Sequence, residues 1–183
     1  MRIIAGEFRG RVIKSPPDSR TRPTSDRLRE TLFNILAPRI EGSRFLDLCA
    51  GSGAIGMEAV SRGASHTTFV DRSRKACALI EENLDRLNVP EDQTDIHALS
   101  AENFVGRKHE HGWDIVFYDP PYENDYALVL FEFGSPENTL LNEGGILIAE
   151  HHSKNILPDA SGLLRRWRIL KQGETSLSFY ERN

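Results

Sequence analysis

The chain has 183 residues, of which 39% are hydrophobic and 27% charged, and this length and composition predict one ordinary soluble domain. No apolar run approaches the ~20 residues of a membrane-spanning helix, and the first residues lack the pattern of a signal peptide. Two cysteines argue against a disulfide framework, and a net charge of −4 argues against a general polyanion binder. We therefore expect a cytoplasmic protein without a membrane anchor.

The first 40 residues differ in charge from the rest of the chain. They hold nine Arg or Lys against four acids, a net charge of +5, which leaves −9 for the remainder. Such asymmetry indicates a basic arm on an acidic body. Residues 2–13 predict a small hairpin or extended arm that carries Arg9 and Arg11. We divide the chain into this basic arm and helix, residues 1–40, and a catalytic domain, residues 41–183.

A helix is predicted to follow the arm. Pro23, Thr24, Ser25 and Asp26 supply N-cap chemistry with an acid in the first turn. Apolar residues then recur at helical spacing, and Pro38 is expected to end the helix. Its polar face and lead-in carry four arginines: Arg20, Arg22, Arg27 and Arg29.

Residues 44–63, RFLDLCAGSGAIGMEAVSRG, predict a strand, a tight loop and a helix. Three glycines occur within six positions, at Gly51, Gly53 and Gly56. Because glycine has no Cβ, a ligand can approach this backbone closely, beside the unpaired N–H groups of a helix N-terminus.

The glycine spacing satisfies the dinucleotide pattern G-x-G-x-x-G, with Asp71 twenty residues further on. Taken alone, this pattern permits NAD. However, Asp47 stands near the end of the strand, where it would repel a pyrophosphate and attract an amino group. S-adenosylmethionine offers an ammonium and a sulfonium and no phosphate, so we favour it as the ligand. A carboxylate at Asp71 can accept two hydrogen bonds from a ribose diol.

Further strands and helices alternate along the rest of the chain. Strands are predicted at 66–70, 94–99, 115–118 and 145–150, with helices at 73–88 and, broken near Gly134, at 125–141. Residues 167–171 and 176–181 form a closing antiparallel pair, since their connection is too short for a parallel crossover. The predicted fold is therefore α/β, with a doubly wound, mostly parallel sheet. His109 and His111 have no evident third ligand, so no metal site is expected, and His151 and His152 are expected to face solvent.

The second informative stretch is Asp119-Pro120-Pro121-Tyr122, directly after an apolar strand. Pro120 prevents further ladder pairing, and prolines restrict the residues before them, so the turn is stiff. It stands at the carboxyl end of a strand, the edge of a parallel sheet where ligands bind. This turn resembles the D/N-P-P-Y/F motif of methyltransferases that modify exocyclic amino groups of bases.

The whole chain resembles the class I S-adenosylmethionine-dependent methyltransferases, which have a Rossmann-like seven-stranded sheet with an antiparallel last strand. More narrowly it resembles the RsmD family, bacterial 16S rRNA guanine-N2 methyltransferases. The discriminating residues are Arg2-Ile-Ile-Ala-Gly, Arg9-Gly-Arg11 and the block Arg22-Pro-Thr24-x-Asp26-x-x-Arg29-Glu30. The resemblance implies methylation of the N2 amine of guanine 966 in 16S rRNA, within a partly or fully assembled small subunit, by a monomer.

The resemblance also assigns roles to individual residues. It places the catalytic turn at Asp119, Pro120, Pro121 and Tyr122. It assigns cofactor contacts to Asp47, Ala50, Gly51, Ser52, Gly53, Asp71, Arg72, Ser100 and Ala101. At Ser100 the family prefers Asp or Asn. The resemblance assigns substrate contacts to Arg9, Arg11, Arg22, Thr24 and Arg27.

Three other functions remain open from the sequence. An N6-adenine methyltransferase acting on DNA or RNA would need the same turn, although the chain has no added target-recognition domain. An NAD-dependent oxidoreductase would need a substrate domain, for which too little chain remains. A non-catalytic RNA-binding module would have no use for an intact Asp119-Pro120-Pro121-Tyr122 turn.

Overall fold

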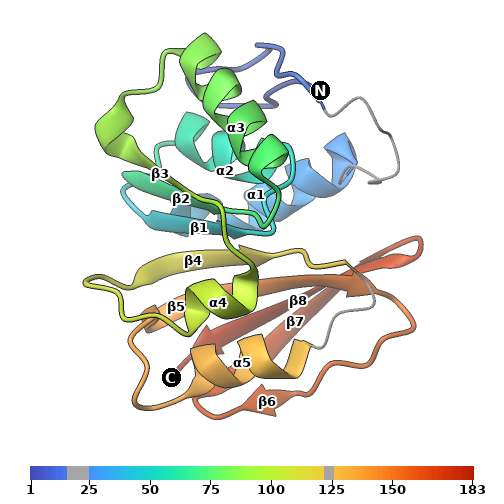
Figure 1. Cartoon of the computed structure of the whole chain (residues 1–183). Helices are drawn as coiled ribbons and strands as arrows, with labels where there is room; N and C mark the ends of the chain where they lie inside the picture. The colour runs from blue at the N-terminus through green and yellow to red at the C-terminus, as the bar shows by residue number, and fades with distance from the viewer. Residues whose placement is uncertain (16–24, 122–125) are drawn as a thin grey trace.

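The computed structural model describes residues 1–15, 25–121 and 126–183. They form one eight-stranded sheet with the strand order β3-β2-β1-β4-β5-β8-β7-β6 (Figure 1). The strands are β1 (Arg44–Leu48), β2 (His66–Val70), β3 (Thr94–His97), β4 (Trp113–Tyr118), β5 (Leu141–His152), β6 (Ala160–Ser161), β7 (Leu164–Gln172) and β8 (Thr175–Arg182). The helices are α1 (Asp26–Ile40), α2 (Ala54–Ser61), α3 (Arg74–Leu87), the 3₁₀ helix η1 (Glu91–Gln93), α4 (Ala101–Val105) and α5 (Tyr126–Gly134).

The first five strands are parallel, and β8, β7 and β6 are antiparallel to their neighbours. This confirms the doubly wound α/β fold with a closing antiparallel pair. The sheet has one strand more than expected, because the two-residue β6 pairs with the start of β7. Strand order reverses between β1 and β4, and ligands bind at such a switch point, beyond the carboxyl ends of the strands.

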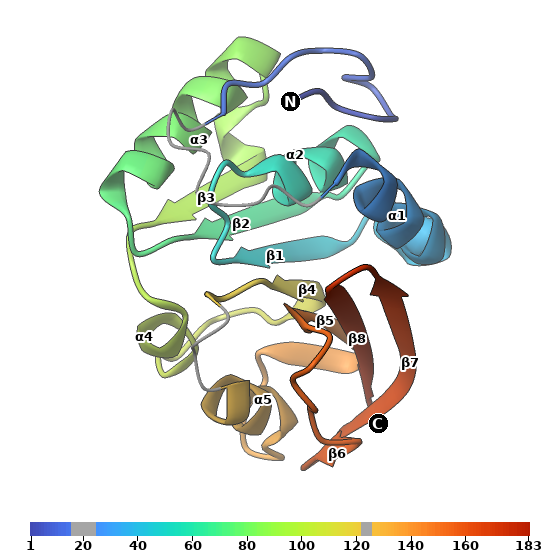
Figure 2. The same ribbon diagram turned by 90° about the vertical axis from the view of Figure 1, so that its right-hand side faces the viewer.

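Helices cover both faces of the sheet (Figures 1 and 2). On one face, which we call the α1 face, α1 and α2 pack on Phe45, Phe117 and Ile148. The N-terminal arm and α3 extend that layer through a second cluster around Phe69 and Met57. On the other face, α4 and α5 pack on Leu48, Tyr118, Ala149 and other strand residues. Both faces of the central strands are therefore buried, as parallel sheets require.

Three predicted boundaries were wrong. Helix α1 continues past Pro38 to Ile40, because Ile40 packs in the core and holds the last turn in place. The helix predicted at 125–141 does break at Gly134, as expected, but it does not resume toward 141; at Gly134 the backbone of Ser161 approaches so closely that a Cβ would meet its oxygen at 2.0 Å. The chain then enters β5 four residues earlier than expected, at Leu141. Within the described residues, no helix is long and apolar enough to cross a membrane.

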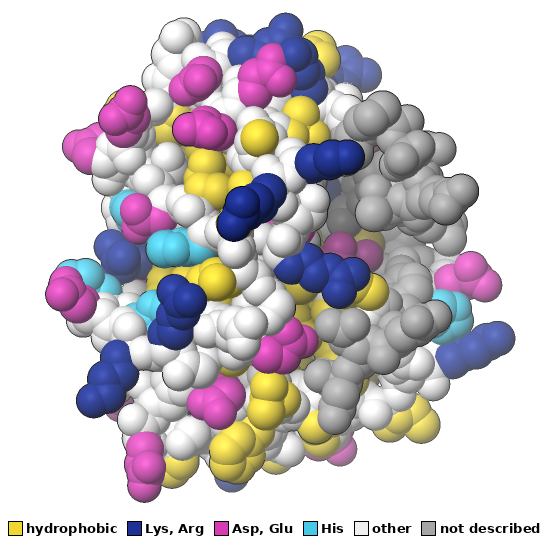
Figure 3. Space-filling model, viewed as in Figure 1, with side chains coloured by type: hydrophobic (Ala, Val, Ile, Leu, Met, Phe, Trp, Pro, Cys, Tyr) yellow, Lys and Arg dark blue, Asp and Glu magenta, His cyan; other side chains and the backbone are white. Residues whose placement is uncertain are grey.

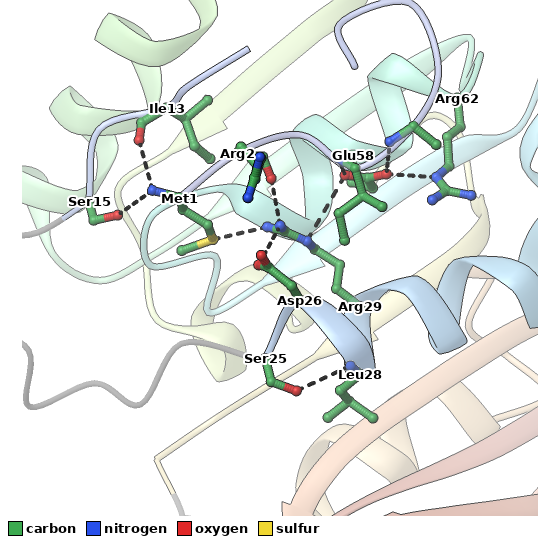
Figure 4. Close-up of polar contacts among 12 residues, drawn as sticks. Met1, Arg2, Ile13, Ser15, Ser25, Asp26, Leu28, Arg29, Glu58 and Arg62 are labelled. Carbon is green, nitrogen blue, oxygen red and sulfur yellow. Dashed lines mark hydrogen bonds and ion pairs between the residues drawn. The ribbon is translucent and has the colours of Figure 1, made fainter. Parts of the chain in front are cut away.

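Residues 1–15 form a hairpin-like loop with a single β-bridge, between Arg2 and Val12. It is anchored on the buried carboxylate of Glu58 in α2, which accepts hydrogen bonds from the backbone N–H groups of Ile4, at 2.8 Å, and Ala5, at 3.0 Å. The fully buried Arg29 lies 4.0 Å from Glu58 and donates to the carbonyl of Arg2 at 2.6 Å (Figure 4). The arm is thus fixed to α1 and α2 by internal charges.

Candidate active site

The loop after β1 and the turn after β4 lie side by side at the carboxyl edge of the sheet. Strands β1 and β4 pair in register from Phe45 and Ile115 to Leu48 and Tyr118. The backbone N–H of Asp119 then donates to the carbonyl of Leu48 at 3.2 Å. The two motifs singled out in the sequence, seventy residues apart, therefore meet at one edge.

The loop backbone turns through conformations that favour glycine. Gly51 and Gly53 have φ of 56° and 75°, and Cys49, which is not a glycine, has φ of 66°. Positive φ at a non-glycine residue is uncommon, and such residues cluster at functional sites. A Cβ on Gly51 would meet no described atom within 4 Å, so this backbone is open to a ligand. Gly56 instead packs against Phe69, whose ring a Cβ would meet at 2.2 Å.

Two aspartates hold this loop in shape. Asp71 accepts hydrogen bonds from the backbone N–H of Gly51, at 2.9 Å, and of Ser73, at 2.8 Å. Asp47 is buried and accepts from the N–H of Gly56 in α2 at 2.9 Å. Burial raises the pKa of Asp47 to about 7, against the lowering effect of the Gly56 bond, and Asp71 adds a further upward influence. Both acids thus shape the loop, in addition to the cofactor contacts predicted for them.

The other predicted cofactor residues lie around the same edge. Ala50 donates its N–H to the carbonyl of Val70 at 3.0 Å, and Ser52 follows in the loop. Arg72 is exposed just after β2. The Ser100 hydroxyl caps α4 by accepting from the N–H of Asn103 at 3.2 Å, and Ala101 is buried beside it. This capping hydrogen bond is the role that the structure shows for Ser100.

The turn after β4 holds its carboxylate next to other acids. Burial raises the pKa of Asp119 well above the usual range, with further upward contributions from the nearby charges of Glu150 and Asp47. Pro120 is buried and Pro121 is exposed. Tyr122 lies outside the described residues. A strongly perturbed acid at a ligand-binding edge is a marker of a functional site.

Acidic side chains surround the loop as a group. Burial raises the pKa of the Cys49 thiol above its ordinary value, and four carboxylates raise it further, namely Asp71, Asp119, Glu102 and Asp47. An environment with this many negative charges favours a cationic ligand and disfavours a pyrophosphate. The residues present therefore fit a ligand that carries an ammonium and a sulfonium better than they fit NAD.

The predicted substrate-binding arginines separate into two groups. Arg9 and Arg27 line a surface hollow of about 340 Å³ between the arm and α1, which Arg2 also lines. Arg11 instead donates to the carbonyls of Arg86, at 2.6 Å, and Leu87, at 3.2 Å, and so caps the last turn of α3. Arg22 and Thr24 lie outside the described residues. On the face seen in Figure 3, Lys and Arg side chains gather over the arm and α3 among acidic ones.

Two residues near the site were missed or misplaced by the sequence. Glu150, at the end of β5, is buried. His151 was expected to face solvent, and this was wrong, because its Nε2 lies 2.9 Å from the Ser178 hydroxyl and its ring packs near Tyr126. Both residues follow directly after the apolar run of β5. That position, at the carboxyl end of an apolar run, could have indicated from the sequence that Glu150 lies near the site.

Comparison with known proteins agrees with this geometry. A solved structure of the Escherichia coli protein yhhF is 33% identical, with a TM-score of 0.89, and the match covers 100% of this chain and 98% of that one. The Bacillus subtilis protein YlbH is 36% identical over 184 residues, which cover 100% of this chain and 99% of that protein. Ribosomal RNA small subunit methyltransferase D of Escherichia coli K12 is 34% identical over 186 residues, with 100% and 90% covered.

The fold and glycine loop are those of the class I S-adenosylmethionine-dependent methyltransferases. A family model described as Conserved hypothetical protein 95 matches residues 1–181. The chain belongs to this family, the RsmD family, as its sequence motifs indicated.

Proposed function

We propose that this protein transfers a methyl group from S-adenosylmethionine to the exocyclic N2 amine of one guanine in 16S rRNA, guanine 966 by family resemblance. The observation that carries the proposal is the contact between the Asp119 turn and the end of β1, where the glycine loop begins, through the Asp119 N–H and the Leu48 carbonyl. The names of the relatives support methylation of small-subunit rRNA, and the choice of guanine N2 rests on the family resemblance.

Different residues around the loop would bind different parts of the methyl donor. When bound, S-adenosylmethionine supplies a methyl group on a sulfonium, already activated for transfer. Asp47 and the backbone of residues 50–53 would hold the methionine part, and Asp71 and Arg72 the ribose. The turn at Ser100 and Ala101 would contact the adenine. The acids that surround Cys49 favour the positive charges of this donor.

The Asp119 turn would orient the acceptor amine. The lone pair of guanine N2 is delocalised into the ring, so the amine is a weak nucleophile. The Asp119 carboxylate and the Pro120 carbonyl would accept from its two hydrogens, and an acceptor placed in advance stabilises the positive charge that develops on nitrogen. Pro121 stiffens the turn, and Tyr122 would stack on the base, which is worth about 1–3 kcal/mol. Holding the amine in line with the methyl group supplies much of the remaining acceleration.

The N-terminal arm would bind the RNA substrate. Arg9 and Arg27, which line the hollow with Arg2, would contact phosphates together with Arg22 and Thr24, whereas Arg11 is engaged at the end of α3. A stacked, paired base cannot present its amine to this edge, so the target must be unpaired or flipped. Because the basic surface is small, we propose that a partly or fully assembled small subunit is the substrate, bound in the cytoplasm by a monomer whose arm, residues 1–40, packs on the catalytic domain.

The test is transfer of radiolabelled methyl groups from S-adenosylmethionine to RNA from cells that lack this protein, followed by nucleoside analysis. N2-methylguanosine in 16S rRNA is the expected product. N6-methyladenosine would keep the fold and the role of Asp119 and overturn the substrate assignment. Running protein-free 16S rRNA beside assembled subunits tests the second part, and equal activity on both would contradict the need for an assembled particle.

A further inference from the structure

The function proposed above assigns no role to Glu150, yet Glu150 stands directly beside Asp119. Tyr118 of β4 pairs with Ala149 of β5, so the next residues on the two parallel strands, Asp119 and Glu150, are neighbours. Ile148 packs on the α1 face, and side chains two positions apart on a strand share a face, so Glu150 points to the α1 face too. Phe117 packs on that face as well, which places the Asp119 side chain there.

A buried carboxylate is unusual in a position that only needs to fill space. The Glu150 side chain is buried and its backbone carbonyl accepts a hydrogen bond from the Tyr126 hydroxyl at 3.0 Å, which fixes the end of the strand. Burial raises the Asp119 pKa most, and the charge of Glu150 raises it further, by more than the charge of Asp47 does. Two carboxyl groups this close hold one negative charge more easily than two.

We propose that Glu150 is the residue that selects guanine, by accepting a hydrogen bond from the N1–H of the target base while Asp119 receives the adjacent N2 amine. This inference rests on the proposed function. The order of the strands is compatible with it, because the cofactor loop follows β1, Asp119 follows β4 and Glu150 lies near the carboxyl end of the neighbouring β5. The N1 of a base whose N2 amine is held by Asp119 can then reach Glu150.

The chemistry of the base edge makes this arrangement selective. Guanine presents adjacent donors, N1–H and N2–H₂, to which two carboxyl groups are complementary. Adenine presents an unprotonated N1 beside its amine, so a carboxylate there faces an acceptor and leaves both groups unsatisfied, which is costly in a buried site. Flipped bases are read at this edge by hydrogen bonds of this kind. Glu150 thus argues for guanine and against the N6-adenine alternative.

The experiment compares two acceptors in 16S rRNA assembled into subunits: the natural guanine, and 2,6-diaminopurine placed at the same position by ligation. Diaminopurine keeps the N2 amine and lacks N1–H. The natural enzyme is expected to prefer guanine by about ten- to a hundredfold in kcat/KM, as befits a hydrogen bond to a charged group. Glu150→Gln is expected to lose at least tenfold of that preference, because an amide N–H can donate to the unprotonated N1. Glu143→Gln makes the same change at the exposed start of β5 and should leave the preference unchanged.

A second readout reports on the charge of Glu150. Within the described residues, the titratable groups that interact with Asp119 include Glu150 from β5, Asp47 from β1 and the thiol of Cys49. Removing the charge of Glu150 lowers the Asp119 pKa, so activity that needs ionised Asp119 should reach its plateau at lower pH in Glu150→Gln. Carbon-13 NMR of labelled aspartate carboxyls shows the same shift without any substrate. The pKa shift reports the charge of Glu150 beside Asp119, and a residue with only a structural role would leave the base preference unchanged.

The outcomes separate the two proposals. If the natural enzyme forms no N2-methylguanosine, the proposed function fails, and the role of Glu150 fails with it. If it does form that product, and Glu150→Gln keeps the base preference, only the role of Glu150 is overturned, whatever happens to the Asp119 pKa. The guanine preference of the natural enzyme tests the proposal whether or not the variant folds, and absence of that preference would also contradict it. Unchanged cofactor affinity by calorimetry is expected.

Discussion

Two clusters of charged side chains lie on the α1 face of the sheet, one around the buried Glu58 and one around the buried Asp47 and the partly buried Asp119, and they have opposite environments. Glu58, in α2, accepts hydrogen bonds from Ile4, Ala5 and Arg62, and the buried Arg29 lies beside it. Asp47 and Asp119, at the carboxyl edge, lie near further acids instead, and their pKa values are raised. Burial alone therefore does not make a carboxylate functional.

What differs is the compensation of charge. A buried charge is stable when it is paired and hydrogen-bonded, and costs free energy when it is not. Around Glu58 the compensation comes from the protein itself, which indicates a structural anchor for the arm. Around Asp119 the charged neighbours that raise its pKa, Glu150 and Asp47, are both acids, an environment that suits a ligand with donor groups or positive charge. The two clusters can be tested against each other by removing one acid at a time.

The largest effect is expected from Asp119→Ala. Loss of the acceptor for the amine should lower the rate of methyl transfer by at least a thousandfold, equivalent to about 4 kcal/mol, while cofactor affinity stays nearly unchanged. Single-turnover kinetics and calorimetry measure the two quantities, and Asp85→Ala on the exposed side of α3 provides the control. A loss of cofactor affinity as large as the loss of rate would contradict the separation of roles.

Glu58→Gln should affect stability and leave the chemistry intact. It removes the negative charge that faces Arg29 and Arg62, and breaking a buried pair costs about 3–5 kcal/mol. Denaturant unfolding measures this loss, and limited proteolysis should show earlier cleavage in the arm. The control is Glu82→Gln, whose ion pair with Lys14 is half-exposed and worth at most about 1 kcal/mol. Equal effects of the two substitutions would show that Glu58 is not the anchor.

The raised pKa of Asp47 predicts a pH-dependent stability. The folded protein holds this proton up to about pH 7, whereas the unfolded chain releases it near pH 4, so the stability that the protonated form provides is lost as the pH rises from 4 to 7. The free energy of unfolding should fall by at most about 4 kcal/mol across that range on this account. Asp47→Asn should remove that part of the slope, as denaturant titrations at several pH values would show. An identical slope in the variant would contradict it.

The sequence was sufficient to predict the fold, and the sheet edge at which the glycine loop and the Asp119 turn meet, for a physical reason. Strands buried on both faces read as continuous apolar runs, and glycine and proline mark the loop at Gly51 and the turn at Pro120. Helix and strand boundaries were predicted wrongly where tertiary contacts determine them. Helix α1 continues past Pro38, for example, because Ile40 packs in the core. Asp119 and Glu150 are neighbours only because of the register between β4 and β5. Arg11 contacts α3 because the carbonyls of Arg86 and Leu87 at the end of that helix accept its hydrogen bonds. Neither relation is local in sequence.

The smallest expected effects separate two arginines that the sequence grouped together. Arg27 is exposed at the hollow beside the arm, so Arg27→Ala should weaken binding of 16S rRNA and reduce the slope of log affinity against log salt by about one. Arg11→Ala removes two hydrogen bonds to the end of α3 and should lower the free energy of unfolding by about 1 kcal/mol, with little change in the salt slope. Filter binding at several salt concentrations and denaturant unfolding, applied to both variants, measure the two effects. If Arg11→Ala changes the salt slope as much as Arg27→Ala does, Arg11 also contacts phosphate. The distinction between charges paired within the protein and charges that bind a ligand would then not apply to the arm.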